Sequence, residues 1–337
     1  MTFAAPAADR LNAAIGGLRV GVIGAGVMGT NHARVLSVLP GVKLVGIAEP
    51  AADNRTRADK MVGCPTFDNV DALLDAGLDA VTIAAPTHLH HDIALACIAR
   101  GIHVLVEKPI ASTVEEGNAI VAAAKKAGVT LMVGHVERFN PAVSTIKQAI
   151  AGEEILSIAI TRVGPFPPRM SNVGVVIDLA VHDIDLIRWF TESDIIEVQP
   201  QLSSAIAERE DIALLQFRTA SGVLAHINTN WLTPFKARNV TVATRGKYVM
   251  GDLLTRQVTE CFGFQHDGSY SMRHLSVGYD EPLRSELSAF VQAVRGGGAP
   301  PVTGEQGVAS LEIAIRCLDT ATRHDVGGKQ LRAAGQN

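Results

Sequence analysis

The first part of the chain alternates between short apolar runs and stretches with helical spacing. The apolar runs, which we predict to be strands, cover residues 18–23, 43–48, 80–84, 103–106 and 130–133. The predicted helices between and after them cover residues 31–39, 51–62, 71–76, 90–100 and 114–127. Short continuous apolar strands separated by helices are typical of a parallel sheet covered on both faces. Such α/β sheets bind ligands at the carboxyl ends of their strands.

The pattern changes after about residue 140. Longer runs follow one another without a helix between each pair, at residues 155–162, 197–202, 211–218, 222–231 and 239–243. They predict a mostly antiparallel sheet. Additional helices are expected at residues 177–190, 283–294 and 307–322. We therefore expect three parts: a tail (1–17), a parallel α/β domain with a ligand site at its strand ends (18–140), and an α+β domain (141–330).

Composition and charge narrow the class of protein. Hydrophobic residues make up 47% and charged residues 19% of the 337 residues, an ordinary globular mixture. The net charge of -4 and the lack of a basic run argue against nucleic-acid binding. No stretch predicts a membrane span, and residues 1–17 lack the pattern of a signal peptide. The four cysteines are far apart, which favours free thiols and a cytoplasmic protein.

The first predicted strand leads into the glycine loop Gly24-Ala25-Gly26-Val27-Met28-Gly29. In such a loop the first glycine allows a tight turn and the second lets the backbone approach a pyrophosphate. The third lets the following helix pack against the sheet, and the N-terminus of that helix attracts the phosphates. Because the glycine loop lies between a predicted strand and a predicted helix, it predicts a dinucleotide site. Residues 18–140 are therefore expected to be a dinucleotide-binding Rossmann domain.

Glu49 follows the second predicted strand and indicates which dinucleotide binds. A carboxylate there accepts hydrogen bonds from the adenosine ribose hydroxyls and repels a 2′-phosphate, which favours NAD over NADP. The nearby Arg55 weakens this preference. Alternatively, Glu49 is a solvated charge at the end of a strand.

Two further clusters carry ionisable groups. The first, Glu107-Lys108-Pro109, ends the fourth predicted strand. A lysine there can reach a substrate hydroxyl and favour its ionised form, and proline rigidifies the turn. From spacing alone, Lys108 could equally be a surface lysine.

The second cluster contains Asp178, His182 and Asp185. Asp178 and His182 are four residues apart and share a face if the segment is helical. A histidine beside a carboxylate can act as a general base near neutral pH. The residues alone also allow a metal ligand pair or an acidic cluster at the start of a helix.

In this order, the glycine loop, the Glu-Lys-Pro tripeptide and the Asp-x-x-x-His resemble one family. It is the glucose–fructose oxidoreductase / inositol dehydrogenase / rhizopine catabolism (Gfo/Idh/MocA) family of NAD(P)-dependent oxidoreductases. The resemblance covers residues 18 to about 322. Members usually have several glycines before the Asp-x-x-x-His, whereas here only Gly174 stands there. Within the family, the stretches most like the UDP-N-acetylglucosamine 3-dehydrogenases are 134–141, 165–169, 174–185 and 228–234.

The resemblance implies a role for each matching residue. Lys108 would lie between nicotinamide and substrate, and His182 would take the hydroxyl proton as hydride leaves the carbon. Asp178 would orient the sugar or tune His182, or take part in a proton relay. The other implied cofactor contacts are Ala85, Pro86, Thr87, His90 and Glu107. The other implied substrate contacts are Arg138, Asn140, Arg169 and Trp231.

Two of these implied contacts have a structural alternative. Arg169 could meet the UDP pyrophosphate, because an arginine fork suits phosphate oxygens, or it could only order its loop. Trp231 could stack on a ring or seal the sheet. We expect no metal, because His88, His90 and His91 flank a loop beside the cofactor.

The expected function is oxidation of a sugar hydroxyl to a ketone, on the 3-hydroxyl of UDP-N-acetylglucosamine if the subgroup holds. A dehydrogenase of a free polyol or sugar such as myo-inositol would use the same residues. Some relatives of the fold cleave glycosides with NAD as a transient oxidant. A non-enzymatic dinucleotide sensor is disfavoured by the retained lysine, aspartate and histidine. By analogy, the chain would form a homodimer or homotetramer through the open face of the second sheet.

Overall fold

The computed structural model describes residues 17–167 and 173–325. The chain divides into two compact units, each described here by itself. The first contains the chain up to Val136 together with Glu281–Val308. The second contains Glu137–Asp280 and the residues from Ala309 onward.

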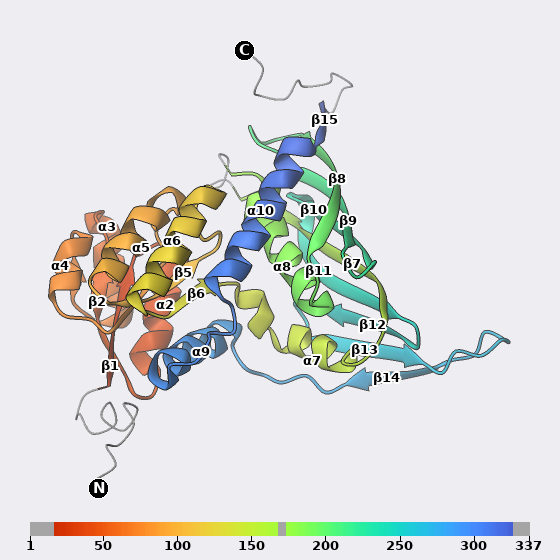
Figure 1. Cartoon of the computed structure of the whole chain (residues 1–337), viewed down its shortest axis with the longest axis horizontal. Coiled ribbons are helices and arrows are strands. Elements are labelled where there is room, and N and C mark those ends of the chain that lie inside the picture. The colour runs from red at the N-terminus through yellow and green to blue at the C-terminus, as the bar shows by residue number, and fades with distance from the viewer. Residues whose placement is uncertain (1–16, 168–172, 326–337) are drawn as a thin grey trace, which may run out of the picture. The chain divides into compact units, whose positions relative to one another are not determined.

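The first unit is built on a six-stranded parallel sheet (Figure 1). Its strands are β1 (Leu18–Ile23), β2 (Val42–Ala48), β3 (Thr66–Phe67), β4 (Ala80–Ile83), β5 (His103–Glu107) and β6 (Leu131–Gly134). They lie in the order β3-β2-β1-β4-β5-β6, which is the arrangement of a Rossmann domain. The direction of winding reverses between β1 and β4, and ligands bind at such a switch point. The predicted parallel α/β domain is thereby confirmed.

Helices connect these strands, and their ends carry the expected local signals. They are α2 (Val27–Val38), α3 (Ala52–Val62), α4 (Val70–Asp75), α5 (His90–Ala99) and α6 (Val114–Ala127), with the short η1 (Thr87–Leu89) before α5. The side chain of Thr113 caps α6 by accepting from the backbone of Glu116. Gly128 ends the same helix in the left-handed conformation, which glycine adopts without strain. Helix α2 packs against α3, and α5 packs against α6.

Helix α9 (Pro282–Gly296) joins the first unit from far along the chain. The predicted organisation keeps residues 281–308 in the second domain, and the structure differs here. The helix buries Leu283, Leu287 and Phe290, which helical spacing places on one face. It packs against α2. The packing of this apolar face, and not the place of α9 in the sequence, therefore determines to which unit the helix belongs.

The second unit contains a nine-stranded sheet that is mostly antiparallel, as predicted. Its strands are β7 (Ile155–Pro165), β8 (Ile195–Ser204), β9 (Ile212–Thr219), β10 (Leu224–Asn230), β11 (Leu232–Thr244), β12 (Lys247–Asp252), β13 (Gln257–Phe262), β14 (Ser271–Leu275) and β15 (Thr322–Asp325). The order is β14-β13-β12-β11-β7-β10-β9-β8-β15. Among the described strands of this second sheet, only the pairs β7–β10 and β8–β15 are parallel.

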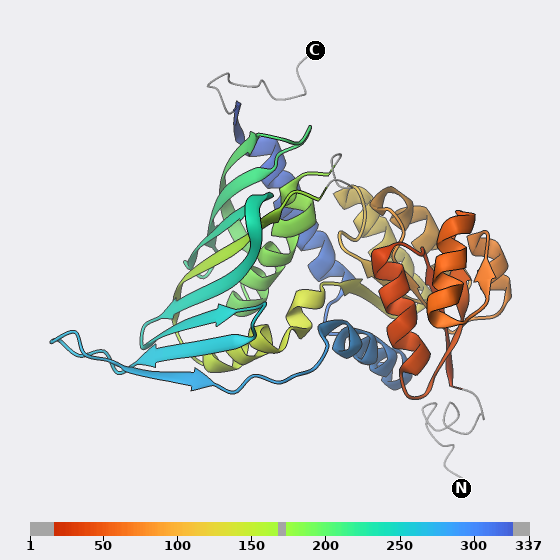
Figure 2. The ribbon, with the colours of Figure 1, turned by 180° about the vertical axis from the view of Figure 1, so that it is seen from behind.

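Helices cover one face of this sheet (Figure 2). They are the short η2 (Val136–Phe139), α7 (Pro141–Ala149), η4 (Val176–Ala180), α8 (Val181–Thr191) and α10 (Gly304–Thr320). Ile158 and Ile160 of β7 and Val240 and Val242 of β11 alternate with more exposed neighbours and join the core under these helices. Helix α7 lies outside the sequence prediction; Asn140 caps it and Pro141 occupies its first turn.

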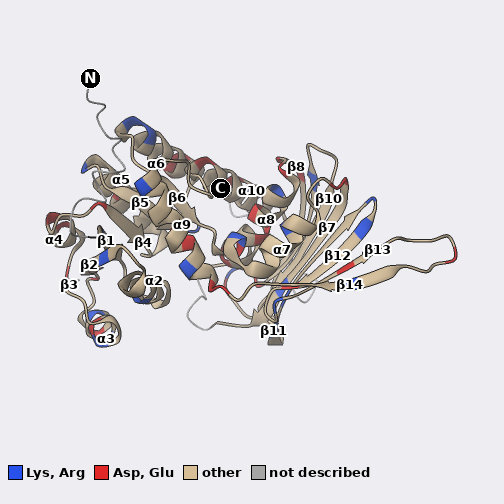
Figure 3. Cartoon of the chain, turned by 90° about the horizontal axis from the view of Figure 1, so that it is seen from below, with Lys and Arg blue, Asp and Glu red and all other residues tan. Residues whose placement is uncertain are grey.

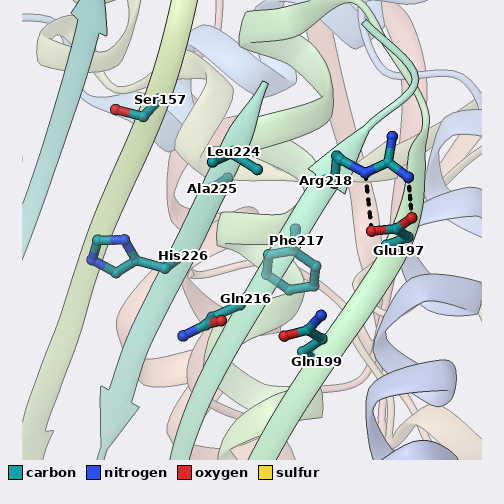
Figure 4. A pocket seen from close by; sticks show the side chains of 9 residues that line it. All are labelled: Ser157, Glu197, Gln199, Gln216, Phe217, Arg218, Leu224, Ala225 and His226. Carbon is teal, nitrogen blue, oxygen red and sulfur yellow. Dashed lines mark hydrogen bonds and ion pairs between the residues drawn. The ribbon is translucent and has the colours of Figure 1, made fainter. Parts of the chain in front are cut away.

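The opposite face of the sheet carries no helix in the described part of the chain (Figure 2). A shallow pocket on this unit has a mixed polar and apolar lining from strands β7 to β10 (Figure 4). Its residues are Ser157, Glu197, Gln199, Gln216, Phe217, Arg218, Leu224, Ala225 and His226. Across it, the Arg218 Nε donates to Glu197 over 2.9 Å.

Charged side chains of both signs are interspersed along the helices rather than gathered by sign (Figure 3). Within residues 17–167 and 173–325, the helices are all too short or too polar to cross a membrane.

Candidate active site

The carboxyl ends of the parallel strands bring four predicted segments to one edge of the first sheet. The glycine loop follows β1, Glu49 follows β2, residues 85–87 follow β4, and residues 107–109 end β5. Strands β1, β4 and β5 are consecutive neighbours in this sheet. The predicted clustering of these segments at the carboxyl edge of the sheet is therefore present, because the carboxyl ends of parallel strands all lie at the same edge.

The glycine loop fits a pyrophosphate in its backbone geometry. Gly24 has a φ of 97°, and a Cβ there would lie 2.6 Å from the Ala84 oxygen. A Cβ on Gly29 would lie 1.9 Å from the Gly24 oxygen, so the loop closes tightly on itself. A Cβ on Gly26 would meet no atom within 4 Å, so this glycine faces open space. Of the three glycines, only Gly26 leaves room for a ligand.

The start of α2 is also suited to an anion. Gly26 is its N-cap and supplies no side-chain cap, and no acidic residue occupies the first turn. The first N–H groups of the helix are therefore available to phosphate oxygens. Val27 is 70% exposed and Met28 is 36% exposed at this terminus, so both side chains are accessible to a bound dinucleotide.

Glu49 is buried rather than a solvated charge, with 8% of its surface exposed. One carboxylate oxygen accepts from the Ala25 N–H over 2.8 Å and the other from the Ala51 N–H over 3.0 Å. Glu49 therefore ties the glycine loop to the end of β2, while each oxygen can accept one more hydrogen bond. Arg55 donates to the carbonyl oxygens of Glu49 and Pro50, both over 2.7 Å, which accounts for its position without a 2′-phosphate.

His90 connects the two other loops of this edge. Its Nε2 lies 2.9 Å from the Ala85 oxygen and its Nδ1 lies 2.9 Å from the Pro109 oxygen. The ring is 1% exposed, and burial lowers its pKa, although the hydrogen bonds to both loops oppose the change. The implied contact of His90 with the cofactor stays a prediction. The ring of His90 holds the loops of residues 85–87 and 107–109 together.

The other two histidines of that cluster face elsewhere. His91 pairs with Asp92, 2.8 Å away, and His88 is exposed in η1. Both nitrogens of His90 lie within hydrogen-bond distance of carbonyl oxygens, and the neutral ring donates to one of them, so these three rings do not converge on one point.

Glu107 holds the turn that carries Lys108. Its Oε1 bonds to the Nε2 of His32 over 2.9 Å, and its Oε2 accepts from the Lys108 N–H over 3.3 Å. Burial raises the pKa of Glu107, but the hydrogen bond and charge of His32 and the charge of Lys108 outweigh it and leave the pKa lowered. Glu107 is 7% exposed and fixes the turn through these bonds, and its implied contact with the cofactor stays a prediction. Lys108 is half-buried, which argues against a plain surface lysine.

In the second unit, Asp178 and His182 lie on the continuous helical segment formed by η4 and α8. Both residues are half-buried. The part that holds Asp178 is a π-helix, a wider turn that is often found at functional sites. The predicted helix is thus present, but it is not a regular α-helix at Asp178.

Gly174 is explained by the residue that packs against it. A Cβ at Gly174 would lie 1.8 Å from Oε1 of Glu210. The same oxygen accepts from the Val176 N–H over 3.4 Å, and the Glu210 carbonyl accepts from the Val175 N–H over 2.9 Å. Glu210 therefore caps the start of the π-helix, and a single glycine is enough to admit its carboxylate.

A buried charge network surrounds the segment of His182. Arg162 is 3% exposed and donates to Asp183 over 2.7 Å and to Glu137 over 2.8 Å. Arg238 also donates to Glu137, over 3.0 Å. Burial raises the pKa of Glu137, but the two arginines outweigh it and leave the pKa lowered. No local sequence pattern indicated this network, because its members lie on separate strands and helices.

Asp178 lies at the edge of the same network. Burial and the charge of Arg162 lower the pKa of Arg238, while Glu137, Asp183 and Asp178 oppose this change. The carboxylate of Asp178 is thus electrostatically connected to the arginine pair. The expectation that Asp178 tunes His182 stays a prediction.

Other implied substrate contacts have structural partners of their own. Arg138 is buried and binds Asp185 through two nitrogens, over 2.7 and 2.6 Å. Asn140 caps α7 and donates to the Leu253 oxygen over 3.3 Å. These contacts hold both side chains within their own unit, and the implied contact of Arg138 and Asn140 with the sugar stays a prediction.

Trp231 is 3% exposed and packs edge-on against Phe166, with ring centroids 5.9 Å apart. Of its two alternatives, this burial favours sealing the sheet over stacking on a sugar. Arg169, the predicted pyrophosphate ligand, lies outside the described residues.

Comparison with known proteins gives matches over most of the chain. A family model described as "Oxidoreductase family, NAD-binding Rossmann fold" matches residues 18–135. A second, described as "GFO/IDH/MocA C-terminal domain", matches residues 154–249.

Curated proteins with similar sequences are named dehydrogenases. The UDP-N-acetylglucosamine 3-dehydrogenase of Acidithiobacillus ferrooxidans is 30% identical over 70% of this chain and 74% of its own length. The scyllo-inositol 2-dehydrogenase (NAD(+)) of Bacillus subtilis is 28% identical over 90% of this chain and 94% of its own. A solved structure of the Acidithiobacillus ferrooxidans enzyme aligns with a TM-score of 0.84 at 26% identity, covering 89% of this chain and 96% of that one.

Proposed function

The chain belongs to the GFO/IDH/MocA family of NAD-binding oxidoreductases, and from this premise we propose that it oxidises the 3-hydroxyl of UDP-N-acetylglucosamine to a ketone, with NAD as the hydride acceptor. The observation that carries the redox half of the proposal is the edge of the first sheet. There the glycine loop, Glu49 and the Lys108 turn follow strands of one parallel sheet. A hydrogen bond joins Glu49 to the glycine loop, and another joins His32 of α2 to Glu107 beside Lys108.

NAD supplies the hydride chemistry, and the protein supplies binding, orientation and proton handling. We assign the backbone N–H groups after Gly26 to the pyrophosphate and the free acceptor sites of Glu49 to the adenosine ribose. The exposed side chains of Val27 and Met28 and the loop Ala85-Pro86-Thr87 line the cofactor.

Loss of hydride from a carbon is easiest when the hydroxyl on that carbon gives up its proton. In our proposal the ammonium of Lys108 stabilises the oxygen as negative charge develops on it. His182 accepts the proton as general base, because an imidazole titrates near neutral pH. Asp178 orients the sugar or favours the charged form of His182.

Support for the UDP-sugar is narrower than support for the redox reaction. It comes from the relative named UDP-N-acetylglucosamine 3-dehydrogenase and from the sequence stretches that led to the same subgroup. A polyol is the second candidate substrate, because the scyllo-inositol 2-dehydrogenase matches a larger share of this chain. Both candidates use Lys108 and His182 in the same way.

A substrate panel with NAD separates these candidates. Turnover would be followed by NADH absorbance with UDP-N-acetylglucosamine, N-acetylglucosamine, myo-inositol and scyllo-inositol. We expect the UDP-sugar to be oxidised with the highest kcat/KM. Preference for an inositol would replace the leading substrate by the second. Release of free sugar from an aryl glycoside without NADH accumulation would identify a glycosidase instead.

The same proposal includes an oligomer and a compartment. We propose a homodimer or homotetramer formed through the helix-free face of the nine-stranded sheet, which a single chain leaves uncovered. The cysteines Cys64, Cys97, Cys261 and Cys317 are free and buried, which supports a reducing, cytoplasmic environment. Sedimentation analysis would establish the oligomeric state.

A further inference from the structure

Three buried ionisable side chains meet beside the Lys108 turn. They are His32 of α2, Glu107 of β5 and Glu286 of α9, and one nitrogen or carboxyl oxygen of each lies within 4.8 Å of the others. His32 and Glu286 are 0% exposed. All three belong to the first unit, so the cluster does not depend on the second.

Two members of the cluster are bonded and one is not. Glu107 bonds to His32 through one oxygen and accepts the Lys108 N–H with the other. Among the described residues, neither carboxyl oxygen of Glu286 has a hydrogen-bond partner. An ionised carboxylate that is fully buried without a donor is strongly disfavoured. The packing of α9 therefore places an acid where only its neutral form is readily accommodated.

The short separation of the Glu107 and Glu286 carboxyl groups determines how many of them can be ionised at once. Two carboxylates this close in a region of low dielectric do not both ionise readily, so one of them keeps its proton. Glu107 is the better anion, because His32 and Lys108 stabilise its charge. Glu286 is left as the neutral member.

We propose that Glu286 lies in the core as a neutral carboxylic acid and is a positioning residue for Lys108, because its neutrality lets Glu107 remain the anion that fixes the turn. The protonation of Glu286 stands on the geometry of the cluster alone. Its effect on Lys108 rests on the proposed function of that lysine.

The charges around the cluster agree with this assignment. Burial first, and then the charge of Glu107, raise the pKa of Glu286 well above its ordinary value. The other ionisable groups on and beside these elements are Lys108, His103 of β5, the buried His135 after β6, Arg284 and Arg295 of α9, and the surface pair of Arg34 on α2 and Glu281 at the start of α9. This pair is 44% exposed on each side, so solvent screens its charges.

The protonation of Glu286 makes a definite prediction for the pH dependence of stability. Its pKa is higher in the folded than in the unfolded chain, so its contribution is fully present below the ordinary value of 4.5 and is lost as the pH rises through the folded pKa. Glu286→Gln keeps the size and neutrality of the side chain and removes its titration. The unfolding equilibrium constant of the wild type should therefore rise relative to this variant by up to about tenfold per pH unit.

The experiment is urea unfolding of the full chain between about pH 5 and pH 9, where such a shift is measurable. The free energies of unfolding of the wild type and Glu286→Gln should differ more as the pH rises, with Glu286→Gln the more stable at alkaline pH. Glu281→Gln makes the same change at the exposed start of the same helix and should run parallel to the wild type. A wild-type-to-Glu286→Gln difference that is constant over this range would overturn the proposal.

Infrared spectroscopy and metal analysis test the protonation of Glu286 without unfolding the protein. A carbonyl band of a protonated carboxylic acid should be present in the wild type at neutral pH and absent in Glu286→Gln. Absence of this band from the wild type would contradict the proposal. So would a stoichiometric metal ion that the wild type holds and Glu286→Gln loses, since the cluster would then be a cation site.

The effect on Lys108 is tested by the pH profile of kcat. At neutral pH, Glu286→Gln should retain wild-type kcat and NADH affinity, since glutamine reproduces the neutral acid. At alkaline pH its kcat should persist above the pH at which the wild type declines. Superposable profiles would overturn the positioning role. If Lys108→Met retained turnover, the proposed function would fail, while the unfolding and infrared results would still decide the state of Glu286.

Discussion

At the scale of residues, the chemistry depends on side chains that are buried by their neighbours rather than on exposed ones. Glu107 is held by His32 and in turn holds the backbone of Lys108. His90 fixes the carbonyls of two loops. Because each of these contacts fixes a backbone segment, the one residue of this edge that we assign to the substrate, Lys108, is set in a rigid frame.

Lys108→Met tests this assignment directly. Methionine keeps the length of the side chain and removes its charge, so we expect kcat to fall by at least about 100-fold, the usual contribution of a group that stabilises or transfers charge. NADH binding, measured by fluorescence, should be unchanged. Lys126→Met, at an exposed position of α6, is the matched control and should behave as wild type. Turnover that survives Lys108→Met would refute the assigned role.

Asp183→Asn tests the buried network beside His182. Removing one charge leaves Arg162 partly uncompensated in the core, which should cost about 3–5 kcal/mol in the free energy of unfolding. Glu197→Gln breaks the exposed pair with Arg218 and should leave stability unchanged, because solvent screens that pair. Chemical denaturation measures both. Equal effects of the two changes would mean that Asp183 is not part of a buried network.

At the scale of elements, the site depends on turns and helix ends. The glycine loop ends β1 and opens α2 without a side-chain cap, while Glu210 caps the π-helix that carries Asp178. In both places a glycine admits a close neighbour that any Cβ would exclude. Local backbone geometry thus determines where each functional segment begins.

The glycines of the loop should separate folding from binding. Gly26→Ala meets no atom within 4 Å and has a φ of -68°, so the chain should fold normally while NADH affinity falls by about tenfold or more. Gly29→Ala places a Cβ 1.9 Å from the Gly24 oxygen and should lower the melting temperature as well. Thermal unfolding and NADH titration report the two effects. Unchanged NADH affinity in Gly26→Ala would exclude the assigned pyrophosphate contact.

Sequence patterns predicted the strands that bear this loop because hydrophobic periodicity is local. They also located the Lys108 turn and the helical segment of His182 for the same reason. They missed the pairing of Arg138 with Asp185 and of Glu107 with His32, since such contacts join distant parts of the chain. They placed α9 in the second domain because the order of elements along the chain does not show that a later helix packs against an earlier sheet. Only the packing of the folded chain shows this.

At the scale of the whole molecule, the chain combines two units of different architecture. The first has the strand order of a Rossmann domain and an edge suited to NAD. The second has a nine-stranded sheet with helices on one face, where a π-helix carries Asp178 and the following α8 carries the candidate base His182. The proposal requires Lys108 of one unit and His182 of the other to act on the same hydroxyl, so neither unit alone should catalyse the reaction.

The central claim is that a hydride leaves C3 of a UDP-linked sugar for NAD. The most direct test is to incubate the full chain with NAD and UDP-N-acetylglucosamine carrying deuterium at C3, and to analyse both products by mass spectrometry. The account predicts reduced cofactor that contains the deuterium, a 3-keto sugar that has lost it, and neither product with Lys108→Met. Reduced cofactor without deuterium, or no reduction of NAD by this sugar, would contradict it.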